Sequence, residues 1–288
     1  MRWRSATLAI GLTVLTVLAG CAGEPDASTQ QRTPPSPSPK PGLQLAEPLL
    51  QDRLDATRRL LTVPLRNGGP GVAHVDRIAL ASPRFTNVPA TTVDGDLAPG
   101  QQINFSIAYG AARCDQDSGK PMLVVEAGER VERLAVPTPA QILDRLWRSE
   151  CDQKQLEAAF TIDWGQSWSQ VPATDGGAAR LRGGLKLTPT GDQPIVVTDV
   201  RGSVMFELDT VPVGKQPITE LESGSRTVPV EIGVRLCFKH GLIEAKKLFD
   251  FTLYALLGDA DQIYRTITPP KLVQQRALAL LATCPKDA

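Results

Sequence analysis

The same order of strand, turn and helix signals occurs twice in this sequence of 288 residues. The first half has short apolar segments at 61–65 and 72–80, and the second half has them at 185–187 and 195–200. A turn rich in Gly or Pro separates the two segments of each pair, as is typical of strands joined by a loop. A repeated order of this kind predicts an internal duplication.

The duplication continues toward the C-terminal end of each half. A turn with a Gly is followed by an apolar strand-like segment, 103–109 or 228–234, and then by a cysteine, Cys114 or Cys237. Several short strands at regular spacing predict a mainly β fold in each half.

A helix is expected at the end of each half. Thr138 precedes Pro139 and Gln141, an arrangement typical of a capping box with Pro in the first turn, and the helix is expected to end at Cys151. Its apolar face would consist of Ile142, Leu143, Leu146 and Trp147. The second helix would follow Thr268-Pro269 and end at Cys284, with a broader apolar stripe made of Leu272, Val273, Leu278, Leu280 and Leu281. Each helix is expected to pack on the strands of its own half.

Four cysteines downstream of Cys21 allow three disulfide pairings. Cys114 and Cys237 follow equivalent strands, whereas Cys151 and Cys284 end equivalent helices. The repeat therefore predicts the pairs Cys114–Cys151 and Cys237–Cys284. No CxxC motif is present, so the sequence predicts structural disulfides and neither a redox centre nor a metal site.

The strand rhythm resembles small immunoglobulin-like modules of bacterial surface proteins, although the Cys…Trp…Cys pattern of antibody domains is absent. The resemblance implies two tandem β-sandwich modules, 43–152 and 153–288, each ending in a short helix held by a disulfide. The composition, with much Ala, Arg, Gly and Pro, resembles that of lipoproteins from high-GC bacteria such as actinobacteria.

The N-terminus has the features of an export signal. Arg2 and Arg4 precede an apolar stretch, 6–18, which is shorter than the roughly 20 residues that a transmembrane helix needs. The residues Leu18-Ala19-Gly20-Cys21 resemble the lipobox of bacterial lipoproteins. The resemblance implies removal of residues 1–20 and attachment of lipid to Cys21, which would hold the protein on the outer face of the cell membrane. The alternative is an ordinary signal peptide with a chance cysteine.

Residues 21–42 are expected to form the lipidated end and a tether. The segment has six prolines between small and polar residues and no aromatic side chain. Such a composition predicts a disordered, semi-extended chain. The whole sequence has 31 basic and 31 acidic residues, and this balance argues against a nucleic-acid partner.

The motifs of common enzyme classes are missing from the sequence. No G-x-S-x-G, H-E-x-x-H, P-loop or dinucleotide-binding motif occurs, and the only imidazoles are His74 and His240. Asp94-Gly95-Asp96 is interpreted as a turn, and the acidic stretch after Cys114 lacks the glutamate that closes a calcium loop. The sequence therefore predicts no catalytic residue, metal or cofactor, although a dispersed catalytic set with His74 or His240 is the third alternative.

Trp164 and Trp168 are the candidate binding surface. They follow an expected strand from 156 to 162 and have no counterpart in the first half. Exposed tryptophans stack on sugars or on the apolar surface of a partner, whereas buried ones would fill a junction or cover a sheet edge. The segment between Gly202 and Gly224, with Phe206 and Leu208, is expected to extend the second sheet.

The favoured function is a lipid-anchored envelope protein that binds or braces another exported or membrane protein without catalysis. A lipoprotein that captures a glycan, a lipid or a transport substrate is the alternative. The sequence lacks the strand–helix alternation of large α/β solute-binding lobes, which disfavours the transport version.

Overall fold

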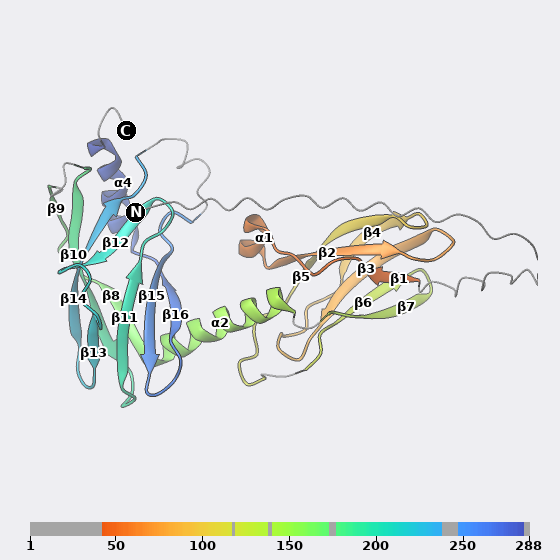
Figure 1. Cartoon of the computed structure of the whole chain (residues 1–288), viewed down its shortest axis with the longest axis horizontal. Coiled ribbons are helices and arrows are strands. Elements are labelled where there is room, and N and C mark those ends of the chain that lie inside the picture. Colours follow the sequence, from red (N-terminus) through yellow and green to blue (C-terminus); the bar gives the residue numbers. More distant parts are fainter. Residues whose placement is uncertain (1–41, 117–118, 138–139, 173–176, 238–246, 285–288) are drawn as a thin grey trace, which may run out of the picture. The chain divides into compact units, whose positions relative to one another are not determined.

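The computed structural model describes residues 42–116, 119–137, 140–172, 177–237 and 247–284 (Figure 1). Within these ranges the fold is mainly β, as the sequence predicts, and consists of antiparallel sheets with two long helices. The strands supply the hydrophobic cores. In β2 (Leu60–Asn67), for example, Leu61, Val63 and Leu65 are fully buried.

Two sheets enclose the first hydrophobic cluster, which extends from Leu43 to Leu143. One sheet has the order β1-β2-β5 and contains β1 (Leu43–Leu45), β2 and β5 (Gln102–Ala108). The other has the order β4-β3-β6-β7 and contains β3 (Ala73–Ala81), β4 (Thr91–Leu97), β6 (Met122–Ala127) and β7 (Arg130–Ala135). A short helix, α1 (Arg53–Arg58), lies between β1 and β2 in the chain.

Two further sheets enclose the second cluster, which extends from Leu156 to Leu280. The first has the order β12-β14-β10-β8, with β9 also paired to β10, and contains β8 (Phe160–Trp164), β9 (Ser169–Val171), β10 (Arg180–Pro189), β12 (Phe206–Thr210) and β14 (Arg226–Val234). The second has the order β13-β11-β15-β16 and contains β11 (Ile195–Arg201), β13 (Thr219–Leu221), β15 (Phe251–Leu257) and β16 (Ile263–Ile267).

The strand pairings of the first half recur in the second. The order β1-β2-β5 corresponds to β8-β10-β14, and the order β4-β3-β6-β7 corresponds to β13-β11-β15-β16. In both halves a helix follows the last strand in the chain. β12 has no counterpart and pairs with β14 at the edge of its sheet, which confirms that the segment after Gly202 extends that sheet.

The first long helix, α2 (Gln141–Ala159), is longer than the sequence suggests. The prediction that it ends at Cys151 is wrong, as is the prediction that a strand begins at Leu156, because the helix continues to Ala159 and β8 begins at Phe160. The residues after Leu156 are Glu157, Ala158 and Ala159, which are strong helix formers. The helix begins after Ala140 without a side-chain cap, and the expected Thr138 and Pro139 lie outside the described residues.

Both hydrophobic clusters include a buried leucine of α2. Leu143 belongs to the first cluster and Leu156 to the second. The expectation that each helix packs on one half alone is therefore wrong for α2. The proposed boundary between residues 152 and 153 falls inside this helix.

The second long helix, α4 (Lys271–Leu280), continues into a short 3₁₀ turn, Leu281–Thr283. Its buried face consists of Val273, Ala277 and Leu280, at the spacing of a single helical face. The broader stripe predicted from the sequence is wrong at Leu272 and Leu278, because both side chains are exposed. Leu272 and Leu278 lie outside the helix face that Val273, Ala277 and Leu280 form.

The two disulfides are Cys114–Cys151 and Cys237–Cys284, with Cα–Cα distances of 5.4 Å and 5.7 Å. They are the pairs predicted from the repeat. Cys114 follows β5 and reaches the middle of α2, whereas Cys237 follows β14 and reaches the residue after the 3₁₀ turn. Each bridge therefore joins a helix-containing segment to the chain that follows an equivalent strand, β5 or β14.

Candidate functional site

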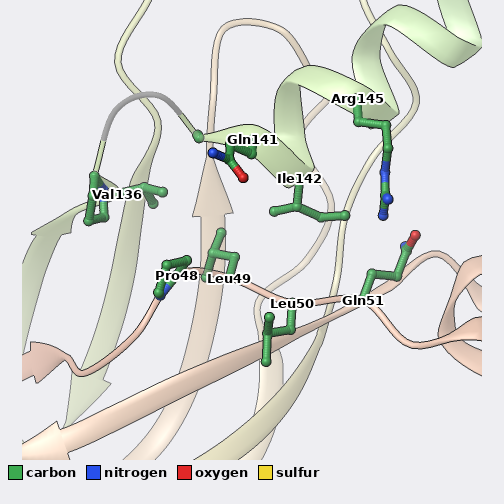
Figure 2. Close-up of a pocket in the computed structure, with 10 residues that line it drawn as sticks. Pro48, Leu49, Leu50, Gln51, Val136, Gln141, Ile142 and Arg145 are labelled. Carbon is green, nitrogen blue, oxygen red and sulfur yellow. The ribbon is translucent and has the colours of Figure 1, made fainter. Parts of the chain in front are cut away.

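A groove of about 610 Å³ lies between the segment before α1 and the first turns of α2 (Figure 2). Its volume is within the range of ligand-binding pockets. The lining residues are Pro48, Leu49, Leu50, Gln51, Val136, Pro137, Ala140, Gln141, Ile142 and Arg145. The lining is mostly apolar, and its polar groups are two amides and one guanidinium.

The segment 48–51 forms one wall because it pairs with β2. Leu50 N–H donates to the Thr62 carbonyl at 3.0 Å, and Thr62 N–H donates to the Leu50 carbonyl at 2.8 Å. Leu49 is almost completely buried in the first hydrophobic cluster. Leu50 is 49% exposed, so its side chain is open to a ligand in the groove.

Gln51 is held in place by its side-chain amide. The Nε2 atom donates to the Leu60 carbonyl at 3.0 Å and to the Tyr109 hydroxyl at 3.2 Å. The Tyr109 ring is buried and is covered by the Arg59 guanidinium at 4.7 Å from its centre. This end of the groove therefore has a defined shape in the absence of a ligand.

The opposite wall is the start of α2. Leu143 is buried and fixes the helix on the first cluster, while Asp144 pairs with Arg84. Ile142 and Arg145 thereby face the segment 48–51, and Figure 2 shows the Arg145 side chain extending toward Gln51. The two walls meet at a polar end with Arg145 and Gln51.

The α2 wall of the groove carries a positively charged side chain. Among the described residues that line it, Arg145 is the charged one, and within the described part of the chain its guanidinium has no ion pair or hydrogen bond. Ala140 supplies no side-chain cap to the first turn of α2, and the acidic residue of that turn, Asp144, pairs with Arg84. An anionic group would be stabilised here.

His74 lies elsewhere, on an exposed position of β3 among three aspartates. Its Nδ1 atom is 2.7 Å from Asp96, and its Nε2 atom is 3.4 Å from both Asp76 and Asp94. The hydrogen bond with Asp96 raises the pKa of His74 above its ordinary value, and the negative charges nearby act in the same direction. His74 sits beside carboxylates on an open sheet face, and no groove-lining residue is among its partners.

The aspartates around His74 correct one prediction. Asp94-Gly95-Asp96 is part of β4 and not a turn. Asp94 has a φ of 45°, and the register between β3 and β4 shifts at this point, as in a β-bulge. No cluster of His, Cys, Asp or Glu in the described ranges is suited to hold a metal ion. His240 lies outside the described residues.

Trp164 and Trp168 do not form an exposed binding surface; of the two interpretations of the sequence, the burial of both side chains is the one that fits. They are 9% and 7% exposed and belong to the second hydrophobic cluster. Trp164 points inward from β8 and contacts the rings of Trp168 and Phe251, each at 5.9 Å between centres. Trp168 covers Gly183 on β10, and its Nε1 atom donates to the Gly165 carbonyl at 2.6 Å.

The proposed lipidation site, Cys21, and the tether up to residue 41 lie outside the described residues. No helix in the described part of the chain is long and apolar enough to cross a membrane.

The sequence does not predict the groove. Ile142 belongs to the expected apolar face of a helix, whereas Leu50 and Arg145 lie in no motif. The available signal was the pair Leu49-Leu50 directly before polar residues, because one of two adjacent leucines in extended backbone must point away from the core.

Comparisons with known proteins add little to this geometry. No family model matches the chain, and no curated protein matches it. Among solved structures, a protein of unknown function from Porphyromonas gingivalis W83 is similar at 13% sequence identity, over 73% of this chain and 90% of that one, with a TM-score of 0.22. At this TM-score the likeness does not establish a common fold.

Proposed function

We propose that this chain is a lipid-anchored cell-envelope protein that binds another exported or membrane protein, without catalysis, through the groove between residues 48–51 and α2. The observation that carries the proposal is the groove, which combines an apolar lining, the exposed Leu50 and the unpaired Arg145. A concave, mostly apolar surface with a few polar groups is the usual form of a binding site.

The anchor is the second part of the proposal. The lipobox-like residues that end in Cys21 and the Pro-rich segment after them support a lipid anchor followed by a tether. The protein would then be held on the outer face of the cell membrane.

The architecture proposed for the exported part is a pair of immunoglobulin-like β-sandwich modules produced by duplication. The recurring strand pairings and the equivalent disulfides support this proposal.

The volume of the groove also favours a second candidate, a lipoprotein that captures a small ligand such as a glycan, a lipid or a transport substrate. About 610 Å³ is sufficient for a ligand of that size. Its lining has no aromatic ring among the described residues, which makes sugar stacking a poor fit.

Photocrosslinking in living cells tests the binding function. A benzophenone amino acid in place of Leu50 is expected to form one discrete adduct with an envelope protein, mapped by mass spectrometry to a single peptide. The matched control is the same substitution at Val72, which is 67% exposed and does not line the groove. Equal adducts from both positions, or none from position 50, would contradict the proposal.

Cell fractionation tests the anchor separately. The Cys21→Ser variant is expected to move from the membrane fraction to the soluble fraction or the medium. The substitution removes the residue that would carry the lipid, so no acyl chain remains to hold the protein in the membrane. If the variant still sediments with membranes, the lipid anchor on Cys21 is wrong.

A further inference from the structure

We infer that the groove takes a short extended apolar peptide segment that carries a carboxylate at the end nearest Arg145. The inference rests on the proposed function and names the chemistry of the partner. Three features of the groove support it: its apolar lining, its unpaired main-chain N–H groups and its charge.

The apolar lining sets the side chains of the ligand. Pro48, Leu50, Val136 and Ile142 present carbon surface on both walls. Covering this surface removes apolar area from water, which is the main favourable term in such association. The central side chains of the peptide are therefore expected to be aliphatic.

Unpaired main-chain donors favour a peptide. Leu50 uses both its N–H and its carbonyl on the β2 side, in bonds to Thr62. In an extended chain the groups of the flanking residues point the opposite way, so the N–H groups of Leu49 and Gln51 face away from β2. Neither N–H has a hydrogen-bond partner among the described residues, and no residue of β2 lines the groove. A peptide main chain supplies carbonyl acceptors at this spacing.

A fatty acid satisfies only part of this geometry. Its acyl chain would cover the apolar lining and its carboxylate would meet Arg145. An acyl chain that covers the groove would displace water from the N–H groups of Leu49 and Gln51 and offer them no acceptor, which costs free energy. The donors therefore decide in favour of a peptide.

The charge of the groove sets the polar end of the ligand. Arg145 is the charged group of the described lining, and it lies at the end where Gln51 closes the groove. A guanidinium binds a carboxylate in a fixed, two-point geometry. A carboxylate at this end of the peptide would complete the pair that the chain itself leaves unmade.

Affinity selection with a soluble peptide library tests the inference. Random octapeptides with free C-termini are incubated with the full chain in detergent, and the retained peptides are identified by mass spectrometry. The expected result is enrichment of sequences with consecutive aliphatic residues next to Asp, Glu or the C-terminus. Repeating the selection with C-terminally amidated peptides shows whether the carboxylate belongs to a side chain or to the chain end.

Binding of a fluorescent copy of the enriched peptide then tests the residues. Arg145→Gln is expected to weaken binding by about tenfold or more, because a charge-assisted hydrogen bond is lost. The matched control, Arg148→Gln, removes the same charge from an exposed residue of α2 that does not line the groove and is expected to leave affinity unchanged. Leu50→Lys should weaken binding, whereas Val72→Lys should not.

Three outcomes would overturn the inference: no enrichment, enriched peptides without a carboxylate, or displacement of every bound peptide by decanoate at low concentration. Equal affinity in the Arg145→Gln and Arg148→Gln variants would also overturn it. If the protein crosslinks to a partner from position 50 in cells but selects no acidic apolar peptide, the proposed function stands and this inference is wrong.

Discussion

Gln153 of α2 and Thr266 of β16 form two hydrogen bonds across 113 residues of sequence. The Thr266 N–H donates to Gln153 Oε1 at 2.7 Å, and Gln153 Nε2 donates to the Thr266 carbonyl at 3.4 Å. β16 is the last strand of its sheet, so these main-chain groups have no neighbouring strand. The side-chain amide takes the place of that strand and covers an edge that would otherwise be open to pairing with another chain.

Replacing Gln153 by Ala should lower the free energy of unfolding by about 1–2 kcal/mol, because two main-chain groups lose their partner. The measurement is urea denaturation followed by circular dichroism. Gln155→Ala is the control, since Gln155 is exposed on the same helix and has no hydrogen bond in the described structure. Equal stability of the two variants would show that the amide contributes nothing to the edge.

Removing the first disulfide should destabilise the protein strongly. The double variant Cys114→Ser, Cys151→Ser frees a loop of 37 residues. Loop-closure entropy then predicts a loss of about 4 kcal/mol, less whatever structure the unfolded chain keeps. The free energy of unfolding is measured by guanidinium denaturation of the variant and of the disulfide-bonded parent protein. A decrease of less than about 1 kcal/mol would contradict a structural role for this bridge.

Gly183 is expected to tolerate no side chain. A Cβ at this position would overlap the indole of Trp168, whose ring lies over β10. Gly183→Ala should therefore cost about 1–3 kcal/mol, as overpacking of a core does, and shift the tryptophan emission to longer wavelength. Gly191→Ala is the matched control, because a Cβ there meets no atom within 4 Å. An unshifted spectrum and unchanged stability in Gly183→Ala would place Trp168 away from this glycine.

The stability of the protein should depend on pH through His74. Its pKa in the folded state is raised above the ordinary value of 6.5, first by the hydrogen bond with Asp96 and then by the charges of Asp76, Asp96 and Asp94, while burial opposes the shift. A raised pKa means that the stabilising contribution is complete below pH 6.5 and is lost as the pH rises through the folded pKa. Salt should reduce the effect, because the group is exposed.

NMR titration of the imidazole protons tests the sign of this shift. The resonance that disappears in His74→Asn identifies the residue, and its midpoint should lie above 6.5 at low ionic strength. The decline in unfolding free energy above that pH should be smaller in His74→Asn than in the parent protein. A midpoint below 6.5 would show that the aspartates do not act on the ring as the distances imply.

The strands and the disulfide pairing were predictable because their signals are local. Alternation in Leu61–Leu65 and the Gly or Pro turns place strands directly, and the repeat then aligns the cysteines. The end of α2 was not predictable from the same signals. Cys151 has no property of a helix end, and the strong helix formers that follow Leu156 stand beside apolar residues that are equally compatible with a strand.

The tryptophans and the groove depend on packing between distant segments. Trp168 is buried because Gly183, far away in the sequence, leaves room for its ring. Leu50 is exposed because the preceding residue, Leu49, lies in the core. The hydrogen bonds of Leu50 with Thr62 of β2 fix the backbone in this position. Composition around Trp164 or Leu50 cannot indicate such relationships, since they are set by residues on other strands.

Crosslinking from position 50 in the Arg145→Gln background tests the central claim most directly. The account predicts that the adduct formed in cells by a benzophenone amino acid at position 50 is lost or strongly reduced with Arg145→Gln and retained with Arg148→Gln. An adduct of the same size and yield in both backgrounds would contradict the claim that the groove binds its partner through Arg145.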